Sequence, residues 1–248
     1  MTISVVQVAT PANGSFTVSA TFAEAPTEGN KIITFCGTNH GASTDSPTPP
    51  LGFEIAVDNN LGGGLKAVFA HKEAGASEPT TVGWATTGGA NQVFAIEVAG
   101  LVDSDTAGDL IDASDVVNDS GTSGTLGPLT AMTLDDVFLL AAFSVANTVS
   151  DVAFDNGFGS ILQEDGRSFW AWKILTDGAT TTPQTTATWT TSRFYYSALV
   201  AYRGAPAAPA HYLERFDGTD WVPMILERFD GDNWVEQVLE RRVGGEWE

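Results

Sequence analysis

A 13-residue unit recurs in tandem near the end of this 248-residue chain. Residues 213–222 read LERFDGTDWV, residues 226–235 read LERFDGDNWV, and residues 239–247 form a diverged third copy, LERRVGGEW. The Asp-Gly pair of the first two copies predicts a tight turn, because a primed hairpin turn needs positive φ angles, which glycine adopts without steric cost. Each copy is therefore expected to form a short β-hairpin with a tryptophan just after its turn.

The repeats, residues 211–248, are too short to close a core alone, because chains below about 40 residues rarely bury enough apolar surface. Burial of one aromatic ring contributes on the order of 2 to 3 kcal/mol, so the rings need a partner surface. Equivalent hairpins of other subunits are the usual partner of a repeated apolar stripe, and packing back onto the rest of the chain is the alternative. We therefore predict a homo-oligomer held by the recurring aromatic residues, Phe216, Trp221, Phe229, Trp234 and Trp247.

A segment rich in proline and alanine, residues 204–210, precedes the repeats. Proline cannot donate a hydrogen bond to a neighbouring strand, and such segments favour an extended spacer. We therefore expect a linker here, between a body formed by residues 1–203 and the hairpin repeats.

The composition of the chain favours strands over helices. Charged residues make up only 17% of it and hydrophobic residues 43%, and glycine occupies 26 positions. This mixture is poor in strong helix formers, and a chain of this length can bury one large sandwich core or two small ones. The expected fold class is all-β.

The body contains one pattern twice, in residues 1–101 and 102–203, at an offset near 105 residues. Neither half closes its own sheet edges, so we expect the two to share one jelly-roll-like antiparallel β-sandwich; two tandem small sandwiches are the alternative. The matching positions are strands 31–35 and 137–141, Gly52-Phe53 and Gly157-Phe158, Trp84 and Trp189, and final strands 93–100 and 197–204.

The charge and the ends of the chain limit its partners and its location. A net charge of -20 argues against nucleic acid as a partner, because binding to phosphate backbones needs clustered Lys and Arg. Residues 1–14 lack the basic and apolar regions of a signal peptide, and the longest strongly apolar run, residues 137–146, is too short to span a bilayer. We therefore expect synthesis in the cytoplasm, no membrane insertion, and release by lysis or as part of a particle.

The sequence offers no recognisable catalytic or cofactor motif. The three histidines, His40, His71 and His211, lie outside any hydrolase, zinc-protease or phosphate-binding pattern. Cys36 cannot form an intrachain disulfide because it is the only cysteine, and with His40 it supplies only half of a tetrahedral zinc site. We expect a buried free thiol, no cofactor and a protein that is not an enzyme.

Residues 103–108 begin like a calcium loop, with carboxylates at the first and third positions and glycine at the sixth. Ala107 and Ser114 occupy the fifth and twelfth positions, where such a loop needs oxygen ligands. The segment is therefore interpreted as a solvated acidic connection between the two halves, and no metal site is expected.

Aromatic residues gather in the second half of the body. Sandwich proteins can display such rings as a platform for sugars, although strands also bury aromatic rings in the core. Alternation places Trp170 and Trp172 on one face of their strand, so both are either core or exposed, and we favour core. The candidate ligand platform comprises Trp170, Trp172, Tyr195 and Tyr196.

Two parts of the chain resemble proteins of tailed viruses. The body motifs at residues 25–30, 49–53 and 75–84 resemble a sandwich domain common in phage tail and other virion-surface proteins. The C-terminal units resemble the tandem aromatic-Asp-Gly-x-x-Trp-Val repeats of phage minor tail proteins, especially those of actinobacterial phages. The third unit departs from this pattern, with Arg242 and Val243 in place of Phe and Asp, which suits a terminal cap.

The resemblance implies a structural component of a bacteriophage virion, most simply a minor tail or tail-fibre protein. It also implies assembly as a homotrimer and contacts with other virion proteins. Two further roles stay open at this point, a host-surface glycan-binding adhesin used in host attachment and a capsid (head) decoration protein.

Overall fold

The structure is a computed structural model of the chain, and it divides into two units, Met1–Ala205 and Pro206–Glu248. It describes residues 2–39, 46–59, 64–104, 106–130, 132, 136–176, 181–205, 213–216, 221–224, 227–229, 234–236, 242–243 and 246–247. Nearly all of the regular structure is antiparallel strand, and the single helix within these ranges is the four-residue α1 (Ala107–Leu110). The predicted all-β sandwich is therefore confirmed.

The first half of the body forms a six-stranded sheet and a separate two-stranded layer. Strands in the six-stranded sheet follow the order β1 (Ser4–Val8), β8 (Ala90–Ala99), β4 (Lys31–Asn39), β6 (Leu65–Glu73) and β5 (Glu54–Asn59), and β2 (Ala12–Gly14) also pairs with β8. The two-stranded layer joins β3 (Thr17–Thr21) to β7 (Thr81–Ala85).

The second half repeats this strand order. Its six-stranded sheet contains β9 (Ile111–Leu126), β14 (Thr185–Arg203), β10 (Val137–Val145), β13 (Ser168–Leu175) and β12 (Gly159–Glu164), and β11 (Ala153–Phe154) also pairs with β14. Counted from one edge, β9-β14-β10-β13-β12 corresponds to β1-β8-β4-β6-β5. The two halves are therefore similar in topology, as their sequence pattern predicts.

Each of the long strands β9 and β14 corresponds to more than one strand of the first half. One end of β14 pairs with Val116 and Val117 of β9 and belongs to the six-stranded sheet. A register shift between Thr188 and Arg193 separates this end of β14 from the other end of the same strand. That other end pairs with the last residues of β9, as β7 pairs with β3. Trp84 of β7 and Trp189 of β14 are both buried in this layer, consistent with their matching places in the sequence.

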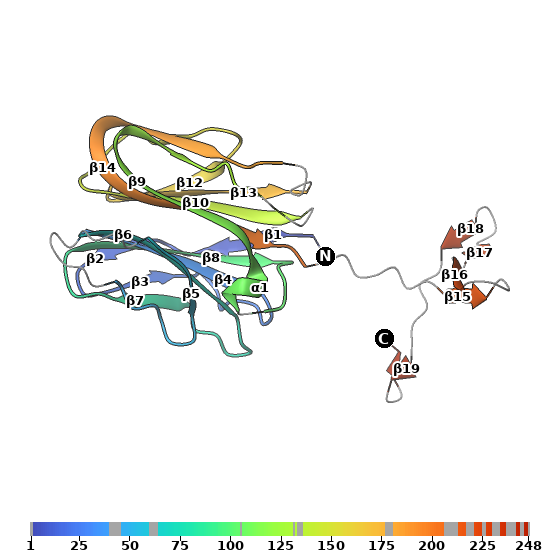
Figure 1. Cartoon of the computed structure of the whole chain (residues 1–248). Helices are drawn as coiled ribbons and strands as arrows, with labels where there is room; N and C mark the ends of the chain where they lie inside the picture. Colours follow the sequence, from blue (N-terminus) through green and yellow to red (C-terminus); the bar gives the residue numbers. More distant parts are fainter. Residues whose placement is uncertain are drawn as a thin grey trace. The chain divides into compact units, whose positions relative to one another are not determined.

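The two six-stranded sheets lie face to face, and the smaller layers lie on their outer sides (Figure 1). A central core between the sheets takes residues from both halves, including Phe35, Phe94, Leu140 and Trp170. Two outer cores each belong to one half, one around Trp84 and the other around Phe143 and Trp189. Each half is thus a small sandwich, and the pair shares the central core.

Side-chain alternation corrects one detail of the sequence alignment. Ile33 and Phe35 of β4 face the central core, and so do Phe138 and Leu140 of β10. The offset between these strands is therefore an odd number of residues, whereas the match of residues 31–35 with 137–141 has an even offset of 106 and equates opposite faces. A slip of one residue moves every side chain of a strand to the opposite face, and turns and glycines in the sequence do not reveal it.

Direct contacts hold the two halves together. The rings of Phe94 and Trp170 lie 5.2 Å apart between centroids. The Nδ2 of Asn59 donates a hydrogen bond of 2.9 Å to the carbonyl oxygen of Ser197, and the Nδ2 of Asn39 donates to the carbonyl of Ala146 at 2.6 Å. The central core is therefore closed by polar contacts that cross between the sheets.

A buried carboxylate fixes the N-terminal segment to β8. Glu97 accepts hydrogen bonds from Gln7 Nε2 at 2.6 Å, from the Thr27 backbone N–H at 2.9 Å and from Asn30 Nδ2 at 2.6 Å. Burial by itself would raise the pKa of this carboxyl, but the hydrogen bonds from Asn30, Gln7 and Thr27 outweigh it and lower the pKa below its ordinary value of 4.5.

Because the folded pKa of Glu97 is lowered, its stabilisation is present above the ordinary value of 4.5 and is lost as the pH falls through the lowered pKa. We expect Glu97→Gln to reduce the free energy of unfolding at pH 7 by about 1.5 to 3 kcal/mol, since it removes charged hydrogen bonds. Urea unfolding at pH 7 and pH 3 measures this, and the deficit should shrink at the lower pH. Exposed Glu28 provides the control, Glu28→Gln; an equal loss in both variants, or a deficit independent of pH, contradicts the assignment.

The C-terminal repeats form three separate two-stranded antiparallel hairpins, as predicted. They are β15 (Leu213–Phe216) with β16 (Trp221–Met224), β17 (Glu227–Phe229) with β18 (Trp234–Glu236), and β19 (Arg242–Val243) with β20 (Glu246–Trp247). The predicted Asp-Gly turns, within residues 217–220 and 230–233, and residues 206–210 of the predicted linker lie outside the described residues. Among the described residues, no helix has the length and apolar character needed to cross a bilayer.

Candidate functional site

Three of the four rings of the candidate ligand platform are buried and the fourth is partly buried, so they do not form an exposed platform. Trp170, Tyr195 and Tyr196 are each at most 3% exposed, and Trp172 is partly buried against the central core. Tyr195 faces the outer core of the second half, whereas Tyr196 faces the central core, because neighbours on a strand point to opposite faces. Both faces of this sheet are covered, so alternation exposes neither tyrosine.

Cys36 and Tyr202 are buried in different cores of the body. Burial raises the pKa of the Cys36 thiol and of the Tyr202 hydroxyl, so both stay protonated at neutral pH. Within the described part of the chain, no three His, Cys, Asp or Glu residues lie close enough to hold a metal ion. His40 and His211, and Asp105 of the calcium-like segment, lie outside the described residues.

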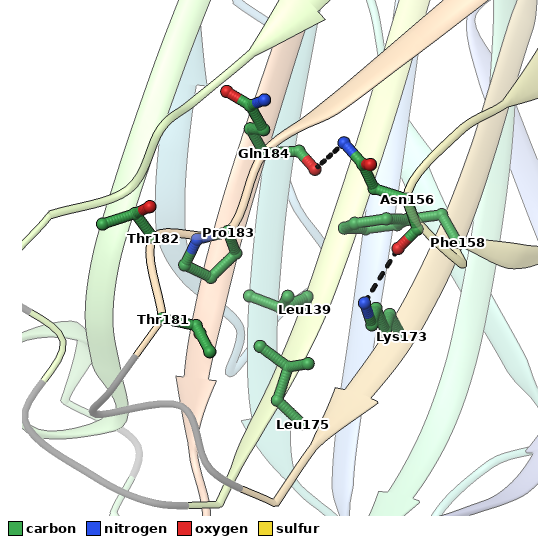
Figure 2. Close-up of a pocket in the computed structure, with 9 residues that line it drawn as sticks. All are labelled: Leu139, Asn156, Phe158, Lys173, Leu175, Thr181, Thr182, Pro183 and Gln184. Carbon is green, nitrogen blue, oxygen red and sulfur yellow. Dashed lines mark hydrogen bonds between the residues drawn. The ribbon is translucent and has the colours of Figure 1, made fainter.

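One open pocket lies on the outer side of the second sheet (Figure 2). It has a volume of about 340 Å³. Leu139 and Leu175 lie between Pro183 on one side and Phe158 and Lys173 on the other. The remaining described lining residues are Asn156, Thr181, Thr182 and Gln184.

Hydrogen bonds between two loops build the rim of this pocket. Lys173 Nζ donates to the Asn156 carbonyl oxygen at 2.8 Å, and Asn156 Nδ2 donates to the Gln184 carbonyl oxygen at 3.1 Å. Asp155 Oδ1 accepts from the Thr186 backbone N–H at 2.6 Å. The Lys173 amine therefore helps to hold the loop that contains Asn156. The floor of the pocket is apolar, and its described lining residues include no acid–base pair.

A second pocket, of about 420 Å³, has polar walls and draws on both halves of the body. It lies where β2 pairs with the start of β8, and Asp165 of the β12–β13 turn contributes from the second half. We call it the amide pocket, and its described lining residues are Asn13, Gly14, Ser15, Gly89, Ala90, Asn91, Gln92 and Asp165.

Sequence reasoning did not single out the amide pocket. The stretches around Asn13 and around Gly89 indicate only turns, because Asn, Gly and Ser are typical turn residues. Asp165 lies more than 70 residues from the other lining positions, so no local pattern links them. Asp165 reaches the pocket because the two halves pack together.

The predicted oligomerisation residues occupy equivalent places in the hairpins. The backbone of Phe216 pairs with that of Trp221, and Phe229 pairs with Trp234 in the same way. In the third copy Arg242 pairs with Trp247, so the departure from the repeat falls directly opposite the tryptophan. Comparisons of the chain with protein-family models, curated proteins and solved structures found no match.

Proposed function

We propose that this protein is a non-enzymatic structural component of a tailed-virus particle, a minor tail or tail-fibre protein that assembles through its C-terminal hairpins. One observation carries the proposal: the repeats place an aromatic residue directly opposite a tryptophan in successive hairpins. Phe216 pairs with Trp221, and Phe229 pairs with Trp234. The resemblance of these repeats to those of phage minor tail proteins supplies the biological context.

The physics of short hairpins supports assembly. An isolated two-stranded hairpin is at best marginally stable in water, and the described residues of the repeats form three two-stranded sheets. Cross-strand aromatic pairs contribute about 0.2 to 1 kcal/mol each, too little to hold a hairpin without further burial. Equivalent hairpins of neighbouring subunits can supply that burial, and the tail-protein resemblance favours a homotrimer.

The body suits a particle component that must persist outside a cell. Its central core and two outer cores bury large aromatic side chains from both halves. The acidic composition, with a net charge of -20, keeps a concentrated assembly protein soluble and disfavours contact with packaged nucleic acid. The partners expected from this role are other virion proteins.

The test is the position of the protein on virus particles of its source. Antibodies raised against residues 1–205 and coupled to gold should label particle tails in electron micrographs. Label spread over the heads supports the second candidate, a head-decoration protein, within the same structural class. Particles without label, with the protein found only in the soluble lysate, contradict the proposal.

A further inference from the structure

The open pocket on the outer side of the second sheet, which we call the lysine pocket, combines an apolar floor with one cationic group. Leu175 is partly buried on this floor, and Phe158 and Pro183 are buried beside it. Within the described lining, Lys173 is the only charged residue (Figure 2). Apolar surface with a few polar groups is typical of small-ligand sites, and about 340 Å³ lies within their range.

The Lys173 ammonium keeps hydrogen-bonding capacity for a ligand. It carries three N–H donors, and one of them donates to the Asn156 carbonyl oxygen at 2.8 Å. Gly157 lies next to the ammonium, since a Cβ built at this glycine would stand 3.6 Å from the Lys173 Nζ. Because glycine has no side chain, residue 157 does not cover the amine.

The first half shows how this chain neutralises a lysine in a similar place. Lys72 lies on β6, the strand that corresponds to β13, and it belongs to the face of β6 that packs in the outer core. Its Nζ lies 5.6 Å from the centroid of the Phe53 ring and 2.7 Å from Glu78 Oε2. A carboxylate from the same half therefore pairs with this lysine.

The second half supplies no such carboxylate among its described residues. Phe158 matches Phe53 in the sequence pattern and lines the lysine pocket, but no ion pair within the described part of the chain includes Lys173. Acidic residues outnumber basic ones by 31 to 11, so carboxylates are not scarce in this chain. A lysine left without one beside an apolar pocket suits an anionic ligand.

The lining selects a monoanion with an apolar body. A carboxylate can accept the remaining N–H donors of Lys173, and such charge-assisted hydrogen bonds are stronger than neutral ones. The apolar floor favours a hydrocarbon group next to the carboxylate, because burial of apolar surface is favourable. The described lining holds no arginine and no second lysine, so it offers little hold on a phosphate dianion.

We propose that the lysine pocket binds a small carboxylic acid with an aliphatic or aromatic body, its carboxylate paired with Lys173 and its hydrocarbon part on the apolar floor. In this complex the ligand supplies the carboxylate that Glu78 supplies to Lys72 in the first half. The site goes beyond the structural role proposed above and does not depend on it.

The test is a titration of the full-length chain with trifluoromethylbenzoate, followed by fluorine NMR. The neutral trifluoromethylbenzamide and inorganic phosphate are the comparison ligands. We expect saturable binding of the carboxylate, and binding about tenfold or more weaker for the amide, the loss of one charge-assisted contact. Hexanoate should compete with the fluorinated carboxylate, because it carries the same group on an aliphatic body.

Variants at Lys173 separate its charge from its role in the loop. Lys173→Gln removes the charge but keeps an N–H donor, and it should weaken carboxylate binding by about tenfold or more. Lys173→Arg keeps the charge and should retain binding. Lys72→Gln is the matched control, because it makes the same change on the corresponding strand, where Glu78 already pairs with the lysine, and it should leave binding unchanged.

Thermal melting shows whether each variant is folded at the temperature of the titration. Should Lys173→Gln fail to fold, the comparison of carboxylate with amide on the parent decides alone.

Any of four results overturns the proposal. They are no saturable binding of either carboxylate, equal binding of carboxylate and amide, equal binding by the parent and a folded Lys173→Gln, and binding of phosphate as tight as that of the carboxylates. None of them bears on the structural role proposed above, since that role is tested on virus particles.

Discussion

Changing Trp221 and Trp234 together to alanine should convert the protein from a homo-oligomer, expected to be a trimer, into a monomer. The two tryptophans occupy the same place in successive hairpins, each opposite a phenylalanine. If neighbouring subunits bury these rings, their removal should cost about 3 to 5 kcal/mol per ring, enough to dissociate a typical assembly at micromolar concentration. Multi-angle light scattering of parent and variant measures the change in mass.

Two controls keep this experiment specific. Glu214→Gln with Glu227→Gln alters equivalent positions of the same two hairpins without removing a ring, and it should stay oligomeric. A chain ending at Ala205, the last residue of the body unit, should be a folded monomer with a β-type circular dichroism spectrum. A monomeric parent, or an oligomer unchanged in the tryptophan variant, refutes assembly through the hairpins.

The second large effect is expected in the central core. Phe94 is fully buried, and its ring lies 5.2 Å from Trp170 of the other half and 6.0 Å from Phe35 of its own. Phe94→Ala should lower the free energy of unfolding by about 3 to 5 kcal/mol, a large part of the 5 to 15 kcal/mol typical of a domain. Because the core is shared, tryptophan fluorescence and far-UV circular dichroism should report one common, shifted transition in guanidinium chloride.

Phe194→Ala is the matched control for this prediction, because the Phe194 ring is 47% exposed and outside the central core. It should change stability by less than about 1 kcal/mol. Two separate transitions in the parent, with Phe94→Ala shifting only one of them, are the result that rules out a shared core. In that case the halves are independent sandwiches, the alternative that the sequence leaves open.

Local chemistry explains which features could be predicted from sequence. The hairpin strands recur with the 13-residue period of the sequence, and the pairing of two strands so close in the chain depends on neighbouring residues. The similarity of the halves follows from positions such as Trp84 and Trp189, which lie in equivalent layers of the two sandwiches. Composition predicted the all-β class, because strand and turn residues dominate along the whole chain.

The location of the candidate sites depended on which strands and loops cover each face of the sheets. Whether Trp170 or Tyr195 is core or exposed depends on which layers cover a sheet, and the covering strands are distant in sequence. The amide pocket likewise joins Gln92 to Asp165, 73 positions further along the chain, through the packing of the two halves.

The amino-acid sequence by itself thus indicated the all-β class, the repeated pattern of the body and the hairpin period, because composition and residue pattern can be read along the chain without knowing which sheets pack together. Only the tertiary structure decided the facing sides of β4 and β10, the burial of the aromatic rings and the location of a polar pocket. The physical reason is that burial and register are set by contacts between sheets. A one-residue slip leaves a strand a strand but exchanges its buried and exposed faces.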